Sequence, residues 1–211
     1  MTKKIIIIDY GLGNILSIKN AINNRGHNVI ITSKKKDIET ASHIILPGVG
    51  AFPSAMKKFK DLDLMEAIHK AKERKAFILG ICLGMQILFT NSEEFELTNG
   101  INLIKGNIVR LDKFNNDFKF KLPNIGWRSC ELNVSSNDIS ILKDISLSDK
   151  FYFVHSYGLI NFEKKLNVLK SKYKNIKFPA VVNLENIYGC QFHPEKSGPQ
   201  GLKIIENFLQ L

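Results

Sequence analysis

Short runs of apolar residues without polar interruption constrain the fold of this chain more than any other feature. Residues 5–8 are four consecutive isoleucines, and residues 44–46 and 77–81 are apolar or glycine throughout. A strand covered on one face alternates apolar and polar side chains, so an unbroken β-branched run predicts a strand buried on both faces. Such strands are typical of parallel sheets, because their crossover connections place helices on both faces.

Helical patterns lie between these runs. Ile15, Ile18 and Ile22 recur at helical spacing after the first strand, and apolar residues from 56 to 71 do the same after the third. We also expect a strand at 29–31 and a helix at 85–89. Alternation of strand and helix predicts an α/β fold with a central, mostly parallel sheet and helices on both faces.

The second half of the chain changes character, because short strand-like runs separated by turn-rich segments such as 133–138 dominate it. The runs are 101–104, 108–111, 151–154, 180–184 and 187–192, and a closing helix is expected at 201–211. We expect antiparallel additions to the same sheet. With 211 residues and 44% hydrophobic content, the chain suits one domain over residues 1–211.

Composition argues against several classes of protein. The formal net charge of +10 comes mostly from scattered lysines, without the aromatic interleaving of single-strand nucleic acid binders, so we expect no nucleic acid partner. No apolar stretch approaches the ~20 residues of a membrane span, and Asp9 ends the N-terminal run too early for a signal peptide. Three cysteines do not make a disulfide scaffold, so we expect a cytoplasmic protein.

The strand at 77–81 leads directly into Cys82, which has Gly80 and Gly84 two residues away on either side. This is the nucleophile-elbow pattern with cysteine in the serine position, where a sharp turn lifts the side chain above the sheet. The N-terminus of the following helix favours a thiolate, and the Leu83 N–H is placed to face an oxyanion. The alternative is a buried cysteine between two packing glycines.

Two further segments complete a candidate nucleophilic site. A predicted strand ends at His193, and Glu195 follows two residues on, so both side chains face the same side of an extended segment. The carboxylate can bond one imidazole nitrogen while the other meets the thiol. Two glycines in LPGVGAF, at 46–52, allow a backbone that aims an N–H at an oxyanion. A zinc site on Cys82, His193 and Glu195 lacks a fourth ligand, so we expect no metal.

These segments, in this order, resemble the class I (triad) glutamine amidotransferases over almost the whole chain. Five strings narrow the resemblance to the glutaminase subunits of imidazole glycerol phosphate synthases: DYGLGN at 9–14, PGVGAF at 47–52, GICLGMQ at 80–86, FYFVHSY at 151–157 and HPEKS at 193–197. The resemblance implies the flavodoxin-like amidotransferase fold. It also implies hydrolysis of L-glutamine to glutamate and ammonia through a cysteinyl thioester, without a cofactor.

The resemblance also implies residue roles. Cys82 resembles the nucleophile, His193 the base and acid, and Glu195 the residue that orients the histidine. The backbone N–H groups that would bind the oxyanion belong to Val49 and Leu83. The positions that match glutamine contacts are Gly50, Gln86, Glu94, Ser156 and Tyr157. The positions that match a partner interface or ammonia gate are Asn14, Trp127, Tyr152 and Lys196.

In that family the glutaminase forms a heterodimer with a (β/α)8 cyclase subunit. Ammonia passes through the barrel, and the synthase makes imidazole glycerol phosphate and an aminoimidazole carboxamide ribonucleotide in histidine biosynthesis. The strand at 47–50 is expected to need a peptide flip before its donor faces the oxyanion, which would keep the enzyme quiet until its partner is engaged.

One departure leaves the ammonia acceptor open. The family's usual Pro-His-Met-Gly-Trp-Asn reads Pro-Asn-Ile-Gly-Trp-Arg at 123–128, with Asn124 in place of the His and Arg128 in place of the final Asn. Paralogues that feed ammonia to surface-sugar precursors diverge in a similar way. A catalytically inert binding module on the same fold is a more distant alternative.

Other conspicuous residues have ordinary interpretations. Cys130 and Cys190 lie in or beside strand-like runs and are expected to pack. His155 is expected to pack or to make hydrogen bonds. Trp127, the only tryptophan, is either a core residue or an interface anchor.

Overall fold

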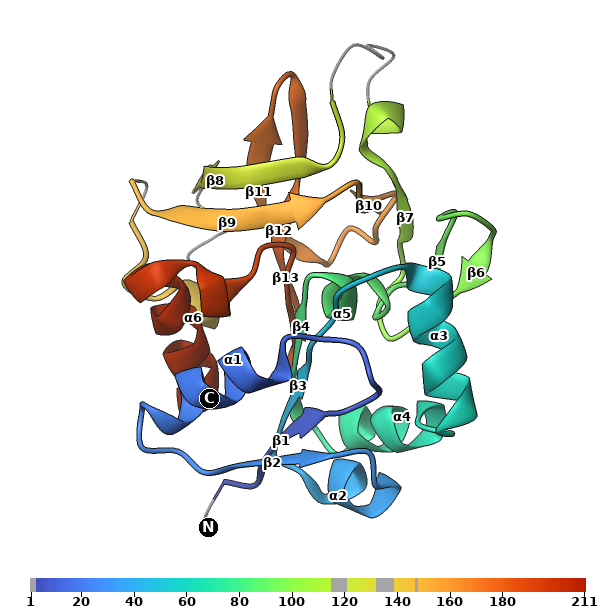
Figure 1. Ribbon diagram of the computed structural model, residues 1–211, viewed down its shortest axis with the longest axis vertical. Coiled ribbons are helices and arrows are strands. Elements are labelled where there is room, and N and C mark those ends of the chain that lie inside the picture. The colour runs from blue at the N-terminus through green and yellow to red at the C-terminus, as the bar shows by residue number, and fades with distance from the viewer. Residues whose placement is uncertain (1–2, 115–120, 132–138, 147) are drawn as a thin grey trace.

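The computed structural model describes residues 3–114, 121–131, 139–146 and 148–211, and the predicted turn at 133–138 lies outside them. A nine-stranded sheet runs through the molecule in the order β2-β1-β3-β4-β13-β12-β11-β8-β9 (Figure 1). Its parallel half consists of β2 (Val29–Thr32), β1 (Ile5–Ile8), β3 (His43–Leu46), β4 (Phe77–Ile81) and β13 (Ile187–Cys190). A strand order of 2-1-3-4 followed by one late strand is that of flavodoxin-like folds.

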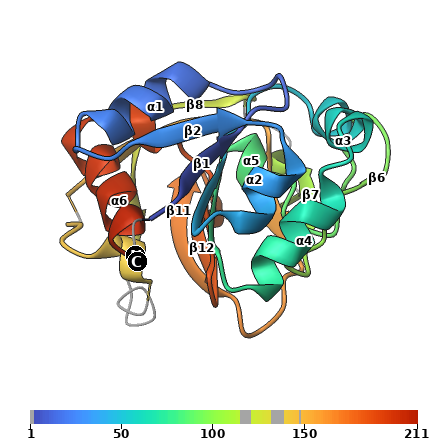
Figure 2. The ribbon, with the colours of Figure 1, turned by 90° about the horizontal axis from the view of Figure 1, so that it is seen from below.

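Helices cover both faces of this parallel half, as predicted. On one face lie α1 (Ile15–Asn23) and α6 (Gly198–Gln210), and on the other α3 (Phe52–Asp61) and α4 (Met65–Glu73), with α2 (Lys35–Thr40) packed beside α4 (Figure 2). The isoleucines of β1 alternate between two cores: Ile5 and Ile7 pack under α1 and α6, and Ile6 and Ile8 under α3 and α4. Each of these side chains contributes about 1.5–3 kcal/mol on full burial, so the sheet centre is the stable scaffold of the site.

The antiparallel half continues the same sheet through β12 (Ile176–Leu184), β11 (Asn167–Tyr173), β8 (Asn124–Glu131) and β9 (Lys150–His155). A separate four-stranded sheet contains β10 (Tyr157–Ile160), β7 (Asn107–Arg110), β5 (Asn91–Ser92) and β6 (Thr98–Asn99). The prediction that all late strands join one sheet is therefore wrong for 108–111. The chain changes sheets at Ser156, between β9 and β10, and β10 then pairs with β7.

Two local predictions are also corrected. The helix expected at 85–89 begins earlier and spans only one turn, as α5 (Leu83–Gln86). The strand expected at 101–104 is absent, because this buried segment covers the end of α5 instead: the Ile101 N–H donates to the Ile87 carbonyl at 2.7 Å, and the Leu103 N–H to the Leu88 carbonyl at 2.9 Å. Carbonyl groups at a helix end lack intrahelical donors, so this segment satisfies them.

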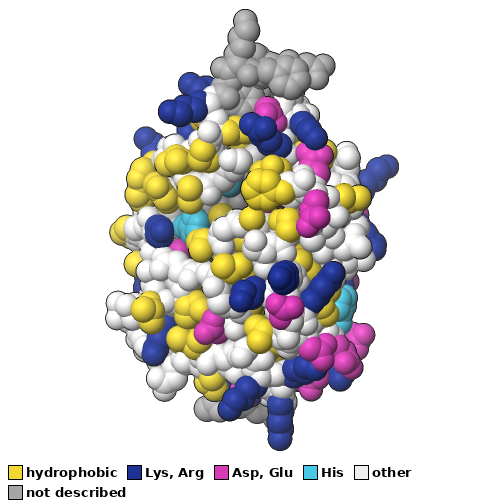
Figure 3. All heavy atoms as spheres, turned by 45° about the vertical axis from the view of Figure 1, so that its right-hand side comes forward, with side chains coloured by type: hydrophobic (Ala, Val, Ile, Leu, Met, Phe, Trp, Pro, Cys, Tyr) yellow, Lys and Arg dark blue, Asp and Glu magenta, His cyan; other side chains and the backbone are white. Residues whose placement is uncertain are grey.

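Charge is spread over the surface. On the face seen in Figure 3, Lys and Arg side chains are interspersed with Asp and Glu. Within the described ranges, no helix is long and apolar enough to cross a membrane.

Candidate active site

Cys82 lies on a strained turn between β4 and α5. Its φ of 54° and ψ of −111° fall in a region that non-glycine residues rarely adopt. The Cys82 N–H donates to the Cys190 carbonyl at 2.7 Å, and the Cys82 carbonyl accepts from the Gln86 N–H at 3.1 Å. A Cβ on Gly84 would lie 1.9 Å from the Leu46 carbonyl oxygen, so this position tolerates only glycine. The predicted elbow geometry is present.

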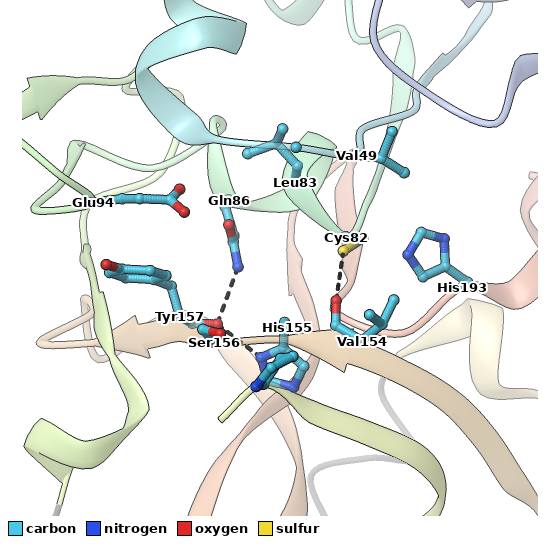
Figure 4. A pocket seen from close by; sticks show the side chains of 12 residues that line it. Val49, Cys82, Leu83, Gln86, Glu94, Val154, His155, Ser156, Tyr157 and His193 are labelled. Atoms are coloured by element: carbon cyan, nitrogen blue, oxygen red, sulfur yellow. Dashed lines mark hydrogen bonds between the residues drawn. The ribbon is translucent and has the colours of Figure 1, made fainter. Parts of the chain in front are cut away.

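His193 follows β13 and is fixed by its own backbone. Its N–H donates to the Tyr152 carbonyl at 3.0 Å, and its carbonyl accepts from the Ser197 hydroxyl at 2.6 Å. Its Nδ1 lies 2.9 Å from Glu195 Oε1, and both side chains are almost fully buried. Its Nε2 has no hydrogen-bond partner among the described groups, and the ring lies beside the Cys82 sulfur (Figure 4). One nitrogen is thus held by a carboxylate, and the other is free to exchange a proton.

The electrostatics of this cluster favour a charged histidine. Burial lowers the pKa of His193, but Cys82 and Glu195 together outweigh it and hold that pKa at about 10. An imidazolium beside a thiolate is the ion pair that cysteine nucleophiles use. The proton on His193 is also the one that a departing amine would need.

A cavity of about 360 Å³ opens in front of Cys82 (Figure 4). Nine of the residues that the sequence singled out line this cavity: Val49, Gly50, Cys82, Leu83, Gln86, Glu94, Ser156, Tyr157 and His193. They come from five separate segments of the chain. Pro123, Val154 and His155, to which the sequence analysis gave no site role, also line the cavity. Its size suits one small ligand.

Polar groups that line the cavity are firmly held. Glu94 Oε2 accepts a hydrogen bond of 2.8 Å from the Phe52 N–H at the start of α3, and burial raises the pKa of Glu94. The Gln86 side-chain amide donates to the Tyr157 carbonyl at 3.1 Å and to Gln191 Oε1 at 3.0 Å. A carboxylate together with fixed amide and carbonyl groups can orient a zwitterionic amino acid.

The glycine-containing segment after β3 forms the rim of the cavity. The Tyr10 hydroxyl donates to the Pro47 carbonyl at 2.5 Å, and Gly50 has a φ of +101°. Val49 is 40% exposed. Leu83 is the first residue of α5, so its N–H has no intrahelical acceptor. Both predicted oxyanion donors therefore belong to residues that line the cavity, Val49 at its rim and Leu83 at the start of α5.

The four predicted interface residues lie outside the cavity lining. Asn14 donates a hydrogen bond of 3.4 Å to Glu195 Oε1. Lys196, which follows Glu195 in the chain, is exposed. Trp127 is 52% exposed and packs edge-on against Tyr152, with ring centroids 5.9 Å apart, so it is not a core residue. Asn14, Lys196 and Tyr152 thus adjoin His193 or Glu195, and Trp127 packs on Tyr152.

Two residues near the site were missed from the sequence. Gln191 is fully buried, accepts from Gln86, and places its Nε2 3.8 Å from the Cys82 sulfur. Tyr10 holds the rim through Pro47, and burial raises its pKa. The spacing of Gln191 and His193 offered a signal, because residues i and i+2 of an extended segment face the same side. Tyr10 had no such signal.

The remaining interpretations concern packing. Cys130 and Cys190 are buried free thiols, and burial raises the pKa of Cys130 to about 12. His155 makes hydrogen bonds through both ring nitrogens. No cluster of three or more His, Cys, Asp or Glu side chains able to hold a metal occurs in the part of the chain that the structure describes.

This fold is that of the class I glutamine amidotransferases. The family model for "Glutamine amidotransferase class-I" matches residues 6–211. Solved structures agree on the fold: one glutamine amidotransferase has a TM-score of 0.74 at 16% identity, covering 98% of this chain and 97% of that one. PurLQS from Thermotoga maritima has a TM-score of 0.68 at 21% identity, covering 100% of this chain and 99% of that one.

Sequence relatives narrow the family. The imidazole glycerol phosphate synthase subunit HisH of Caldanaerobacter subterraneus subsp. tengcongensis is 44% identical over 96% of this chain and 95% of that protein. The subunit HisH of Lactococcus lactis is 41% identical over 99% of this chain and 98% of that protein. The chain therefore belongs to the class I glutamine amidotransferases and, within them, to the HisH glutaminase subunits of imidazole glycerol phosphate synthase. The predicted family and fold are confirmed.

Proposed function

We propose that this chain hydrolyses L-glutamine through Cys82, His193 and Glu195 and passes the ammonia to a (β/α)8 cyclase subunit in a heterodimer. One observation carries the catalytic assignment. Among the described residues His193 Nε2 has no hydrogen-bond partner, and it lies beside the sulfur of a cysteine in a strained turn, while Nδ1 is held by Glu195 at 2.9 Å. This is the arrangement that acyl transfer by a cysteine requires.

The first half-reaction forms the thioester. The Cys82 thiolate attacks the side-chain carboxamide carbon of glutamine, and the carbonyl electron pair moves onto oxygen. The backbone N–H groups of Val49 and Leu83 stabilise that oxyanion. His193 then gives its Nε2 proton to the amide nitrogen, the C–N bond breaks, and ammonia leaves.

The second half-reaction releases glutamate. Neutral His193 accepts a proton from water as the water oxygen attacks the thioester carbon. Collapse of this second oxyanion breaks the C–S bond and returns Cys82 as a thiolate beside the protonated histidine. Glu195 stays ionised throughout and keeps the imidazole oriented.

The other cavity residues bind substrate in this proposal. The Glu94 carboxylate pairs with the α-ammonium group of glutamine. Gly50, Gln86, Ser156 and Tyr157 contact the rest of the amino acid. The support is that all five line the cavity that also contains Cys82.

The partner proposal concerns the surface around Trp127, Tyr152, Asn14 and Lys196. Its support is an exposed tryptophan next to the nucleophilic cluster and the subunit names of the relatives. The synthase product would be imidazole glycerol phosphate, together with the aminoimidazole carboxamide ribonucleotide, in histidine biosynthesis.

We further propose that residues 1–211 act as one domain, and that the protein works in the cytoplasm, where its three free thiols stay reduced.

A glutaminase assay with and without a histidine-pathway cyclase subunit tests these assignments. Replacement of Cys82 by alanine should lower glutamine hydrolysis at least roughly 10³-fold, because no other group in the cavity supplies the nucleophile. The matched control is Cys130→Ala, which removes a buried thiol outside the cavity. Hydrolysis that survives in Cys82→Ala would overturn the catalytic assignment. Failure of the cyclase subunit to stimulate the wild-type chain would instead favour a surface-sugar partner.

A further inference from the structure

Asn124 and Arg128, two positions at which residues 123–128 differ from the family's usual string, contact each other. Arg128 Nε donates a hydrogen bond of 2.5 Å to Asn124 Oδ1. The Arg128 guanidinium also lies 4.5 Å from the centroid of the Tyr173 ring and donates to the Ile125 carbonyl at 3.4 Å. Because an arginine has only donors, it fixes Oδ1 as the side of the Asn124 amide that faces it. The amide nitrogen must then point the other way.

Asn124 in turn determines the tautomer of His155. Its Nδ2 lies 2.9 Å from His155 Nε2, and both residues are buried. An amide nitrogen can only donate, so His155 Nε2 must accept and carries no proton. The ring proton is therefore on Nδ1, which lies 2.8 Å from the Tyr157 carbonyl and donates to it. Burial agrees with a neutral ring, since it lowers the pKa of His155 to about 4, with Arg128 and His193 adding to the effect.

The same Tyr157 carbonyl accepts the hydrogen bond from Gln86 at 3.1 Å. His155, Ser156, Tyr157 and Gln86 all line the cavity in front of Cys82. A chain of donors therefore runs from half-buried Arg128 to the wall of the cavity. With the other tautomer of His155, a nitrogen lone pair would face the Tyr157 carbonyl oxygen, and the two would repel.

We propose that Arg128 and Asn124 are positioning residues for glutamine binding: together they fix the Nδ1–H tautomer of His155, which holds the Tyr157 carbonyl and, through it, Gln86. The proposal rests on the glutaminase function proposed above. It gives the departures from the family pattern a role inside the chain itself. Neither residue touches the reacting atoms, so their effect falls on substrate binding.

The kinetic test uses the full chain with its cyclase partner and three variants. Arg128→Met removes the donors and keeps the length, Arg128→Lys restores one donor, and Asn124→Asp removes the donor to His155. We expect KM for glutamine to rise about tenfold in Arg128→Met and Asn124→Asp, with kcat changed less than about threefold, as fits one lost charge-assisted hydrogen bond. Arg128→Lys should recover at least about half of the effect on a logarithmic scale.

The matched control is Lys172→Met, because Lys172 is an exposed cation in the same surface groove as Arg128. It should leave KM unchanged. A KM increase of equal size in Lys172→Met would mean that lost surface charge, rather than the hydrogen-bonded chain, is responsible, and it would overturn the proposal. So would an unchanged KM in Arg128→Met and Asn124→Asp.

A spectroscopic readout separates positioning from a merely structural role. ¹⁵N NMR of histidine-labelled chain should give the Nδ1–H tautomer for His155 in the wild type, and a proton on Nε2 in Asn124→Asp. An Nε2–H tautomer in the wild type, or no change in Asn124→Asp, contradicts the proposal. If the wild type fails to hydrolyse glutamine at all, the proposed function fails, whereas the tautomer result still decides the state of His155.

Discussion

Gln86 donates a hydrogen bond of 3.0 Å to Gln191, whose own amide nitrogen lies 3.8 Å from the Cys82 sulfur. Gln191 is completely buried, so no water competes for either contact. One side chain therefore connects the proposed nucleophile to a wall of the substrate cavity. Cys82 and Gln86 keep their relative positions because both contact the side chain of Gln191, which directly follows β13.

The first prediction concerns this connection. Replacement of Gln191 by leucine removes the acceptor for Gln86 and should cost about 1–3 kcal/mol of unfolding free energy. Glutamine hydrolysis should fall as well, because Gln86 loses one of its two fixed contacts. Urea unfolding and steady-state kinetics measure the two effects. The exposed Gln210→Leu serves as control and should stay within about 0.5 kcal/mol of wild type. Wild-type stability in Gln191→Leu would show that the contact is energetically neutral.

The second prediction concerns the glycines of the elbow. A Cβ on Gly84 would lie 1.9 Å from a backbone oxygen of β3, so Gly84→Ala must displace the strand or the turn, at a cost of about 3 kcal/mol or more. Gly26, by contrast, has a positive φ, of 76°, and open space around it, so Gly26→Ala should cost only about 1 kcal/mol. Thermal or chemical denaturation of both variants measures the difference. Equal losses would mean that crowding at Gly84 costs no more than the backbone strain of a positive φ at Gly26.

The third prediction is a pH dependence. The folded-state pKa of His193, about 10, lies above the ordinary value of 6.5. A raised pKa contributes stability that is complete below pH 6.5 and is lost as the pH rises through about 10. Because Glu195 supplies part of this effect, wild type should be more stable than Glu195→Gln at pH 6, and the gap should narrow toward pH 10. Urea unfolding at pH 6, 8 and 10 measures it; a gap that widens with pH has the wrong sign.

The fourth prediction concerns the proposed interface. Trp127 is 52% exposed beside Tyr152, and large aromatic anchors dominate binding energies at interfaces. Truncation to alanine should therefore weaken binding of the cyclase subunit by about 2 kcal/mol, or roughly 30-fold. Isothermal titration calorimetry measures the affinity. Ile30 on β2, an exposed hydrophobic residue on the opposite edge strand of the sheet, provides the control, Ile30→Ala. If both variants bind as the wild type does, the interface lies elsewhere.

The parallel half of the fold followed from local patterns. Four consecutive isoleucines fit only a strand with cores on both sides, and residues 5–8 have that environment. Residues 101–104 were misassigned because periodicity cannot distinguish an apolar strand from an apolar loop that covers a helix end. The second sheet was missed because it forms only when β10, which follows Ser156, pairs with the distant strand β7. The local sequence does not show which strand β10 pairs with.

The sequence by itself determined the chemistry of this protein: the glycines around Cys82 and the spacing of His193 and Glu195 are local, since sterics and strand geometry act over a few residues. Only the tertiary structure decided what surrounds that chemistry. The contacts from Gln191 to Cys82, from Tyr10 to Pro47 and from Asn124 to His155 join residues 31 to 109 positions apart. Pairings of this kind depend on how the sheets and helices pack, and no local pattern encodes them.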